Sequence, residues 1–129
     1  MLDTDVVIEV DKGRLELPDA ACYISALTLY EYIRGKRDYR RAKELAEQVY
    51  YVLPVSNKVL LLASGIWRKL KTAGMLVDDR DLLIGATAIA HELPLYTLNR
   101  RHYERLLEYG LQLWPQTPRG QAKPSSKPT

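Results

Sequence analysis

The sequence predicts a single α/β domain with a short central parallel sheet. Short β-like runs alternate with helical patterns along residues 1–114, as expected when crossover helices join parallel strands. A chain of 129 residues that is 47% hydrophobic is large enough to build one compact core. Residues 115–129 contain four prolines, three basic residues and no acidic residue, so we predict a disordered tail there.

The elements of the first half follow from local residue patterns. Apolar runs predict strands at residues 21–25 (ACYIS) and 50–55 (YYVLPV). The residues between them predict two helices, at 27–35 and 38–50, because their apolar side chains recur at helical spacing. Gly35 is suited to end the first of these helices.

The second half contains the clearest helix signals. Residues 57–74 predict a long helix, with Ser56 as its N-cap and lysines in its last turn. The next helix begins at Asp79 or Asp81 and runs to about Glu92. The remaining predicted elements are a strand at 94–99, a helix at 100–110 that ends at its glycine, and a strand at 111–114.

Composition excludes several classes of protein. The longest apolar runs are about half of the roughly 20 residues that a membrane-spanning helix needs, and no signal-like segment opens the chain. We therefore expect a soluble, cytoplasmic protein with no membrane contact. The single cysteine, Cys22, cannot form an internal disulfide and is predicted to be a small core residue. Only Met1 and Leu2 precede Asp3, so the opening strand is either very short or shortened by the choice of start codon.

Four oxygen-bearing side chains are predicted to share one edge of the sheet. Asp3 follows the first strand, Glu31 lies in the helix after the second strand, and Asp81 lies in the first turn of the helix before the strand at 94–99. Asn99 closes that strand, and the carboxyl ends of parallel strands meet at one edge. Mg²⁺ or Mn²⁺ suits such an oxygen-only set without His or Cys.

Each of these acids also has a purely structural interpretation. Glu31 stands three residues after Thr28, which is the spacing of a capping box. Asp79 or Asp81 would serve as a helix N-cap, where the helix dipole favours a negative charge. The coincidence of four positions on one edge favours a metal site over these interpretations.

Four stretches of the chain resemble the motif blocks of PIN-domain ribonucleases, closest to the VapC-type toxins. They are residues 2–9 (LDTDVVIE), 24–35 (ISALTLYEYIRG), 81–93 (DLLIGATAIAHEL) and 95–106 (LYTLNRRHYERL), and they occur in order over almost all of residues 1–114. The resemblance implies a three-layer α/β/α domain. It also implies Mg²⁺- or Mn²⁺-dependent cleavage of single-stranded RNA without a protein nucleophile.

The resemblance assigns roles to individual residues. It makes Asp3, Glu31 and Asp81 the metal-binding acidic triad, and Asn99 takes a catalytic position where many members have a fourth aspartate. The neutral amide of Asn99 puts the affinity for a second metal ion in doubt. Asp5, beside the first triad member, and Thr97 are supporting residues. Asp78 and Asp79 match no fixed ligand of the family; they are interpreted as loop and N-cap residues, with Asp79 as a further supporting residue.

The net charge of +3 comes from the tail, because residues 1–114 contain equal numbers of acidic and basic residues. The segment 34–43 is nevertheless strongly basic, and a solvated helix face is its ordinary interpretation. With the family resemblance, part of this segment becomes a candidate surface for the RNA polyanion. The candidate RNA-binding residues are Arg34, Lys36, Arg37, Arg40, Arg100 and Arg101.

Two protein partners are expected. The resemblance implies a cognate antitoxin, as in other toxin–antitoxin pairs. A homodimer is expected partly by resemblance and partly because residues 57–70 (NKVLLLASGIWRKL) have a wider apolar arc than a helix on one sheet face needs. The alternative for this helix is complete burial within one subunit.

Three alternative functions remain open at this point. The chain would be a housekeeping RNA-processing PIN nuclease if no antitoxin exists, or a non-catalytic PIN-like module that binds RNA or protein. A haloacid-dehalogenase-like phosphatase shares an aspartate pair like Asp3 and Asp5, but the order of the remaining motifs argues against it.

Overall fold

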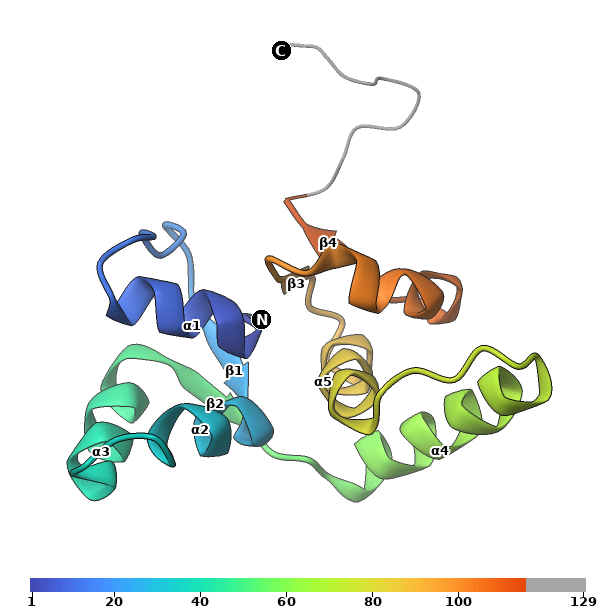
Figure 1. Ribbon diagram of the computed structural model, residues 1–129, viewed down its shortest axis with the longest axis horizontal. Helices are drawn as coiled ribbons and strands as arrows, with labels where there is room; N and C mark the ends of the chain where they lie inside the picture. The colour runs from blue at the N-terminus through green and yellow to red at the C-terminus, as the bar shows by residue number, and fades with distance from the viewer. Residues whose placement is uncertain (116–129) are drawn as a thin grey trace, which may run out of the picture.

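The computed structural model describes residues 1–115, so the predicted tail lies outside the described residues except for Pro115. Within these residues, six helices lie in two groups on either side of a short sheet (Figure 1). One group consists of α1 (Thr4–Asp11), α2 (Ala26–Ile33) and α3 (Tyr39–Val49). The other consists of α4 (Asn57–Thr72), α5 (Asp79–Ala90) and the 3₁₀ helix η1 (Arg100–Tyr109).

The sheet is parallel and is joined at its centre by a single residue. Strand β1 (Tyr23–Ser25) pairs with β2 (Tyr51–Leu53), and β3 (Leu95–Tyr96) pairs with β4 (Leu113–Trp114). Leu2 forms parallel bridges to both Ile24 and Tyr96, which connects the two pairs in the order β2, β1, Leu2, β3, β4. The predicted short parallel sheet is confirmed, and its opening strand is reduced to this one residue.

Separate apolar clusters cover the two faces of the sheet. Leu2, Cys22 and Ile24 are buried against α1, α2 and α3, whereas Leu95 and Leu113 are buried against α4, α5 and η1. Successive strand residues point to opposite faces, so short strands supply both clusters. The arrangement confirms the expected three layers, and the buried free thiol of Cys22 confirms it as a core residue.

Helix α1 was not predicted from the sequence. Its residues Val6, Val7 and Ile8 are β-branched, a composition that is more typical of strands. The side chain of Asp3 accepts a hydrogen bond from the backbone N–H of Thr4, so the acid at the carboxyl end of the central strand also begins the helix.

The predicted N-caps of two other helices are wrong, although α5 begins at Asp79, one of its two predicted first residues. Ser25 caps α2 by accepting from the N–H of Thr28 at 3.0 Å, so Thr28 lies inside the helix and forms no capping box with Glu31. Asp78 occupies the N-cap position of α5, so Asp79 and Asp81 lie in its first turn. The capping-box role of Glu31 and the N-cap role of Asp81 are therefore wrong, because Ser25 and Asp78 occupy the N-cap positions of these helices.

Other predicted helix ends are confirmed. Ser56 caps α4 by accepting from the N–H of Val59. Gly110 ends η1 with φ of 103°, a left-handed conformation that glycine adopts without strain.

Helix α4 is only partly covered. Val59, Ile66 and Leu70 are buried in the core, whereas Leu60 and Leu61 are 45% and 76% exposed. Complete burial of this helix, one of the two expectations, is therefore wrong for the single chain. Within residues 1–115, no helix is long and apolar enough to cross a membrane.

Candidate active site

Arg80 lies at the centre of three acidic side chains from different parts of the fold. Its Nε donates to Oε2 of Glu31 in α2 at 2.7 Å, its Nη1 to Oδ1 of Asp81 in α5 at 2.7 Å, and its Nη2 to Oδ1 of Asp3 at 3.0 Å. Because a guanidinium is small and planar, the three carboxylate oxygens lie within about 8 Å of one another. The fold thus brings together the three acids that the sequence grouped.

Asp3 is held from two directions. Its Oδ2 accepts from the hydroxyls of Thr97 and Tyr103, each at 2.9 Å, and both residues are buried. Its Oδ1 accepts from the N–H of Thr4 as well as from Arg80. Burial, together with the negative charge of Asp3, raises the pKa of Tyr103, so its hydroxyl stays protonated and donates. Oδ2 of Asp3 is thereby bound by two buried hydroxyls, and Oδ1 faces Arg80.

Glu31 is oriented by the neighbouring helix α1. The hydroxyl of Thr4 donates to its Oε1 at 2.6 Å, which leaves Oε2 for Arg80. The hydroxyl of the buried Thr28 lies 3.1 Å from that of Thr4 and is hydrogen-bonded to it. Thr28 therefore helps to position Glu31 through side-chain contacts rather than through a helix cap.

Asp81 is buried to 8% exposure in the first turn of α5, where the helix dipole favours its negative charge. Burial raises the pKa of Asp81 above its usual value, although the hydrogen bond and charge of Arg80 act in the opposite direction. Its second oxygen, Oδ2, lies 3.6 Å from Nδ1 of His102. An open cavity of about 430 Å³ adjoins this pair, and Arg101 and Arg105 contribute to its lining.

Asn99 contacts Asp5 and not the three acids around Arg80. Its Nδ2 donates to Oδ2 of Asp5 at 2.9 Å, and the N–H of Leu98 donates to the same oxygen. Asp5 Oδ1 is buried and has no hydrogen-bond partner among the described residues. Burial and the negative charge of Asp3 together raise the pKa of Asp5. Thr97, whose hydroxyl lies 3.4 Å from Asp5 Oδ2, connects this pair with Asp3.

Asp79 stands apart from this network. It is exposed in the first turn of α5, and no contact places it beside the triad. The supporting residues predicted from the sequence therefore divide into Thr97 and Asp5, which adjoin Asp3, and Asp79, which does not.

Sequence reasoning missed four residues of this site. Arg80 had a usable signal, because it directly precedes Asp81 and is the basic residue in an acidic stretch. Tyr103 had no signal in the sequence that marked it as a site residue, since an aromatic residue on an amphipathic helix usually serves only in the core. Thr4 and His102 were also overlooked, although both flank predicted site positions.

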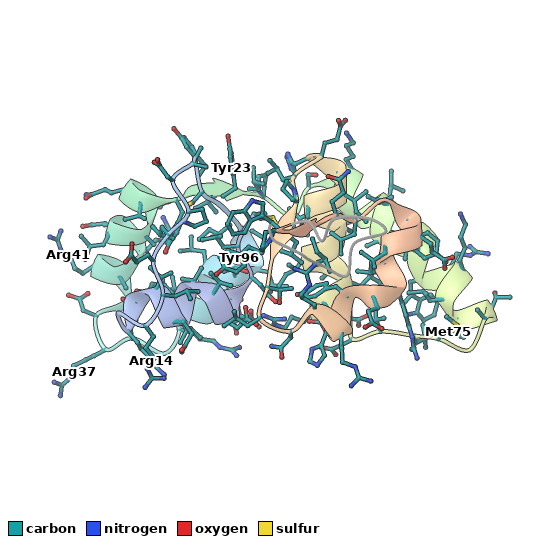
Figure 2. The ribbon with its side chains drawn as sticks, turned by 90° about the horizontal axis from the view of Figure 1, so that it is seen from above. Arg14, Tyr23, Arg37, Arg41, Met75 and Tyr96 are labelled. Carbon is teal, nitrogen blue, oxygen red and sulfur yellow. The ribbon has the colours of Figure 1, made fainter. Side chains whose placement is uncertain are left out.

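The candidate RNA-binding residues occupy different environments. Lys36 donates to Asp11 at 2.6 Å, and Arg34 and Arg40 lie over the rings of Tyr30 and Tyr39. Figure 2 shows Arg37 and Arg41 at one end of the molecule with their side chains directed outward. Tyr96, whose carbonyl accepts from the backbone N–H of Asp3, lies near the middle (Figure 2).

Two other candidates lie nearer to the acids. Arg101 lines the cavity beside Asp81, and it also lines a second open cavity of about 470 Å³ with Asn99 and Arg100. Arg100 additionally donates to the carbonyl of Pro115 at 3.3 Å.

The donor set suits a hard divalent cation, because three carboxylates supply oxygen ligands and a cationic group already lies among them. In the arrangement of residues 1–115, however, no three His, Cys, Asp or Glu side chains are close enough to enclose a metal ion. The guanidinium of Arg80 separates the three carboxylates. The residues therefore fit the ion, provided that Arg80 moves away.

Comparison with known proteins agrees with this fold. Residues 1–106 match the PIN domain family. Ribonuclease VapC1 of Methanocaldococcus jannaschii is 37% identical over 88% of this chain and 85% of its own length. A second Ribonuclease VapC1, from Rickettsia felis, is 26% identical over 82% of this chain and 89% of its own.

Solved structures show the same architecture. A chain of VapBC-1 from nontypeable Haemophilus influenzae is 27% identical, with a TM-score of 0.73 over 88% of this chain and 94% of that one. A chain of DNA-bound VapBC from Salmonella typhimurium is 25% identical, with a TM-score of 0.72 over the same shares. The haloacid-dehalogenase-like alternative receives no support from these matches. The extent of the match, together with the identity to a VapC ribonuclease, shows that this chain belongs to the PIN domain family.

Proposed function

We propose that this chain is a Mg²⁺- or Mn²⁺-dependent endoribonuclease that cleaves single-stranded RNA. The observation that carries the proposal is the convergence of Asp3, Glu31 and Asp81 on a single cationic position at the carboxyl edge of the sheet. Membership of the PIN domain family and the similarity to proteins named ribonucleases support the reaction class.

In this proposal Asp3, Glu31 and Asp81 hold the metal. When bound, the metal supplies an activated water and neutralises charge on the scissile phosphate. The chain's own residues keep the ligands in place before the metal arrives. Tyr103 and Thr97 fix one oxygen of Asp3, and hydrogen bonds to buried hydroxyls keep that carboxylate from turning away.

The substrate is proposed to approach along η1. Arg101 and Arg105 line the cavity beside Asp81, where Asp78 and Glu104 add acidic groups. The two guanidinium groups would attract RNA to a centre that its carboxylates would otherwise make repulsive. Arg37, at the end of the molecule, is a weaker candidate for a phosphate contact than Arg101. Asn99 is assigned a supporting role through Asp5 rather than direct contact with the metal.

We further propose that the chain is the toxin of a toxin–antitoxin pair and that it forms a homodimer. Similar solved structures, which are structures of VapBC, support an antitoxin partner. The exposed Leu60 and Leu61 on α4 support the dimer, because apolar surface of this kind is usually covered by another protein surface. Expression with and without the product of the neighbouring reading frame tests the first idea: growth arrest relieved by that product supports it.

The nuclease itself is tested by comparing single carboxylate-to-amide variants. Purified wild-type protein, Glu31→Gln and Glu16→Gln are incubated with a fluorescent single-stranded RNA and Mn²⁺, with EDTA in a parallel set. Glu16 is exposed in the loop between α1 and β1, so its variant is a matched control. We expect Glu31→Gln to lower the cleavage rate by roughly 100-fold or more, with unchanged circular dichroism. Equal rates in the three proteins, or cleavage in EDTA, would overturn the assignment.

A further inference from the structure

Arg80 uses all sides of its guanidinium to bind the three acids. Nε, Nη1 and Nη2 each donate to a different carboxylate, at distances of 2.7, 2.7 and 3.0 Å. A planar group with several fixed donors is suited to such a three-way contact, whereas a lysine ammonium is a single point charge. The contact joins the N-terminal segment, α2 and α5 in one place.

The oxygens that face Arg80 are also the ones that would bind a metal, although Asp3 Oδ1 accepts from the N–H of Thr4 as well. Asp3 Oδ2 is bound by Thr97 and Tyr103, and Glu31 Oε1 is bound by Thr4. Their other oxygens, Asp3 Oδ1 and Glu31 Oε2, contact the guanidinium. A metal and Arg80 would thus need the same oxygens.

The two cations cannot share this position. Ligand oxygens lie about 2.0 to 2.1 Å from a bound Mg²⁺, so three of them around one ion must approach one another closely. With Arg80 between them, no three such side chains among residues 1–115 come close enough. Binding of a metal therefore requires the carboxylates to close together and the guanidinium to leave.

Departure of Arg80 needs no change of fold. Its side chain is 31% exposed, whereas those of Asp3 and Asp81 are 3% and 11% exposed. Rotation about the side-chain bonds of Arg80 can carry its guanidinium into solvent while α5 stays in place. One oxygen of Asp3 stays bound to Thr97 and Tyr103, and one oxygen of Glu31 stays bound to Thr4.

We propose that Arg80 is a built-in competitor for the catalytic metal: it offsets part of the negative charge of the acidic triad in the metal-free protein and must be displaced when Mg²⁺ or Mn²⁺ binds. This inference rests on the proposed metal-dependent function. It makes the metal affinity of the protein a balance between two cations and not a property of the carboxylates alone. The same guanidinium stabilises the metal-free fold, because it offsets the mutual repulsion of three acids.

The test measures metal binding directly in Arg80→Met. Binding of Mn²⁺ is followed by the loss of the free-ion electron paramagnetic resonance signal and by calorimetry, with no RNA present. Arg101→Met removes a positive charge from the same rim without touching the three-way contact, so it is the matched control. We expect Arg80→Met to bind Mn²⁺ at least about tenfold more tightly than wild type, which corresponds to about 1.4 kcal/mol. For Arg101→Met the change should stay within about twofold.

Thermal unfolding supplies a second readout. In EDTA the Tm of Arg80→Met should lie below that of wild type by roughly 5 °C or more, and saturating Mn²⁺ should raise it more than it raises the wild-type Tm. If Arg80→Met cannot be obtained folded, Arg80→Lys keeps the charge but loses the three-way contact, and we expect a smaller gain in Mn²⁺ affinity in the same direction.

The outcomes separate the two proposals. Equal or weaker Mn²⁺ binding by both Arg80 variants, with binding by wild type, overturns the competition while the metal-dependent function stands. If Arg101→Met gained as much Mn²⁺ affinity as Arg80→Met, the loss of any nearby positive charge would explain the result, and the competition would also be overturned. No binding by any of these proteins at millimolar Mn²⁺ would remove the metal from the proposed function and the competitor with it.

Discussion

Replacing Tyr103 by phenylalanine tests whether the active-site aspartate depends on support from the core. Tyr103 is fully buried in η1, and its hydroxyl donates to Oδ2 of Asp3 at 2.9 Å. The substitution removes one oxygen atom and keeps the ring, so it leaves almost no cavity. Its cost is therefore that of the hydrogen bond itself.

The expected magnitude follows from the partners of Asp3. Hydrogen bonds to charged groups contribute about 1.5 to 3 kcal/mol, and a buried carboxylate that loses a donor finds no water to replace it. Thr97, Thr4 and Arg80 still bind Asp3 in the variant, which favours the lower part of that range. We expect Tyr103→Phe to lower the free energy of unfolding by about 1.5 to 2 kcal/mol, or roughly 5 to 10 °C in Tm.

The assay is urea and thermal unfolding in EDTA, where no metal compensates for the lost donor. Tyr51→Phe is the matched control, because its side chain is 63% exposed and the same atom is removed. Its stability should change by less than about 0.5 kcal/mol. A Tyr103→Phe protein as stable as wild type would refute the reasoning, since it would mean that Asp3 is adequately bound without the core hydroxyl.

Three further predictions concern other parts of the fold. Gly85→Ala should lower the free energy of unfolding in urea by about 1 to 2 kcal/mol despite better helix propensity, because its Cβ would collide with the buried Leu106 side chain. The hydrogen bond from Lys36 lowers the pKa of the Asp11 carboxyl, so in Lys36→Met this carboxyl should titrate at higher pH, as followed by NMR. Because the ionised carboxylate stabilises the fold above its usual pKa, that stabilisation should be lost at a higher pH in the variant as the pH falls. Leu61→Glu should convert the proposed dimer to a monomer by light scattering, and a wild-type monomer at micromolar concentration would contradict the dimer.

Local chemistry was enough to predict much of the secondary structure. Ser56 at the start of α4 and Gly110 at the end of η1 act through their own backbone and near neighbours, so their roles can be read from the chain alone. The helices that begin near Thr28 and Asp81 were recognised for the same reason. Their N-caps were wrong because Ser25 caps α2 three residues before Thr28, and Asp78 occupies the N-cap position of α5 directly before Asp79.

Helix α1 shows where local preference fails. Its β-branched residues favour a strand, but the central strand ends after Leu2, and Asp3 caps the next backbone N–H. Burial of Val6 and Val7 against the sheet then outweighs their modest helix propensity. A preference of a few tenths of a kcal/mol per residue cannot compete with burial worth about 1.5 kcal/mol or more per side chain.

The sequence alone determined the α/β class, the parallel order of short strands and the edge at which Asp3, Glu31 and Asp81 would gather, because strand direction and family pattern set these features. Only the tertiary structure decided what surrounds these acids. Arg80 lies beside Asp81 in the chain, yet its contacts with Glu31 and Asp3 span 49 and 77 positions, and the contact of Tyr103 with Asp3 spans 100. Such contacts depend on how whole layers pack, and nearest-neighbour preferences along the chain carry no information about that packing.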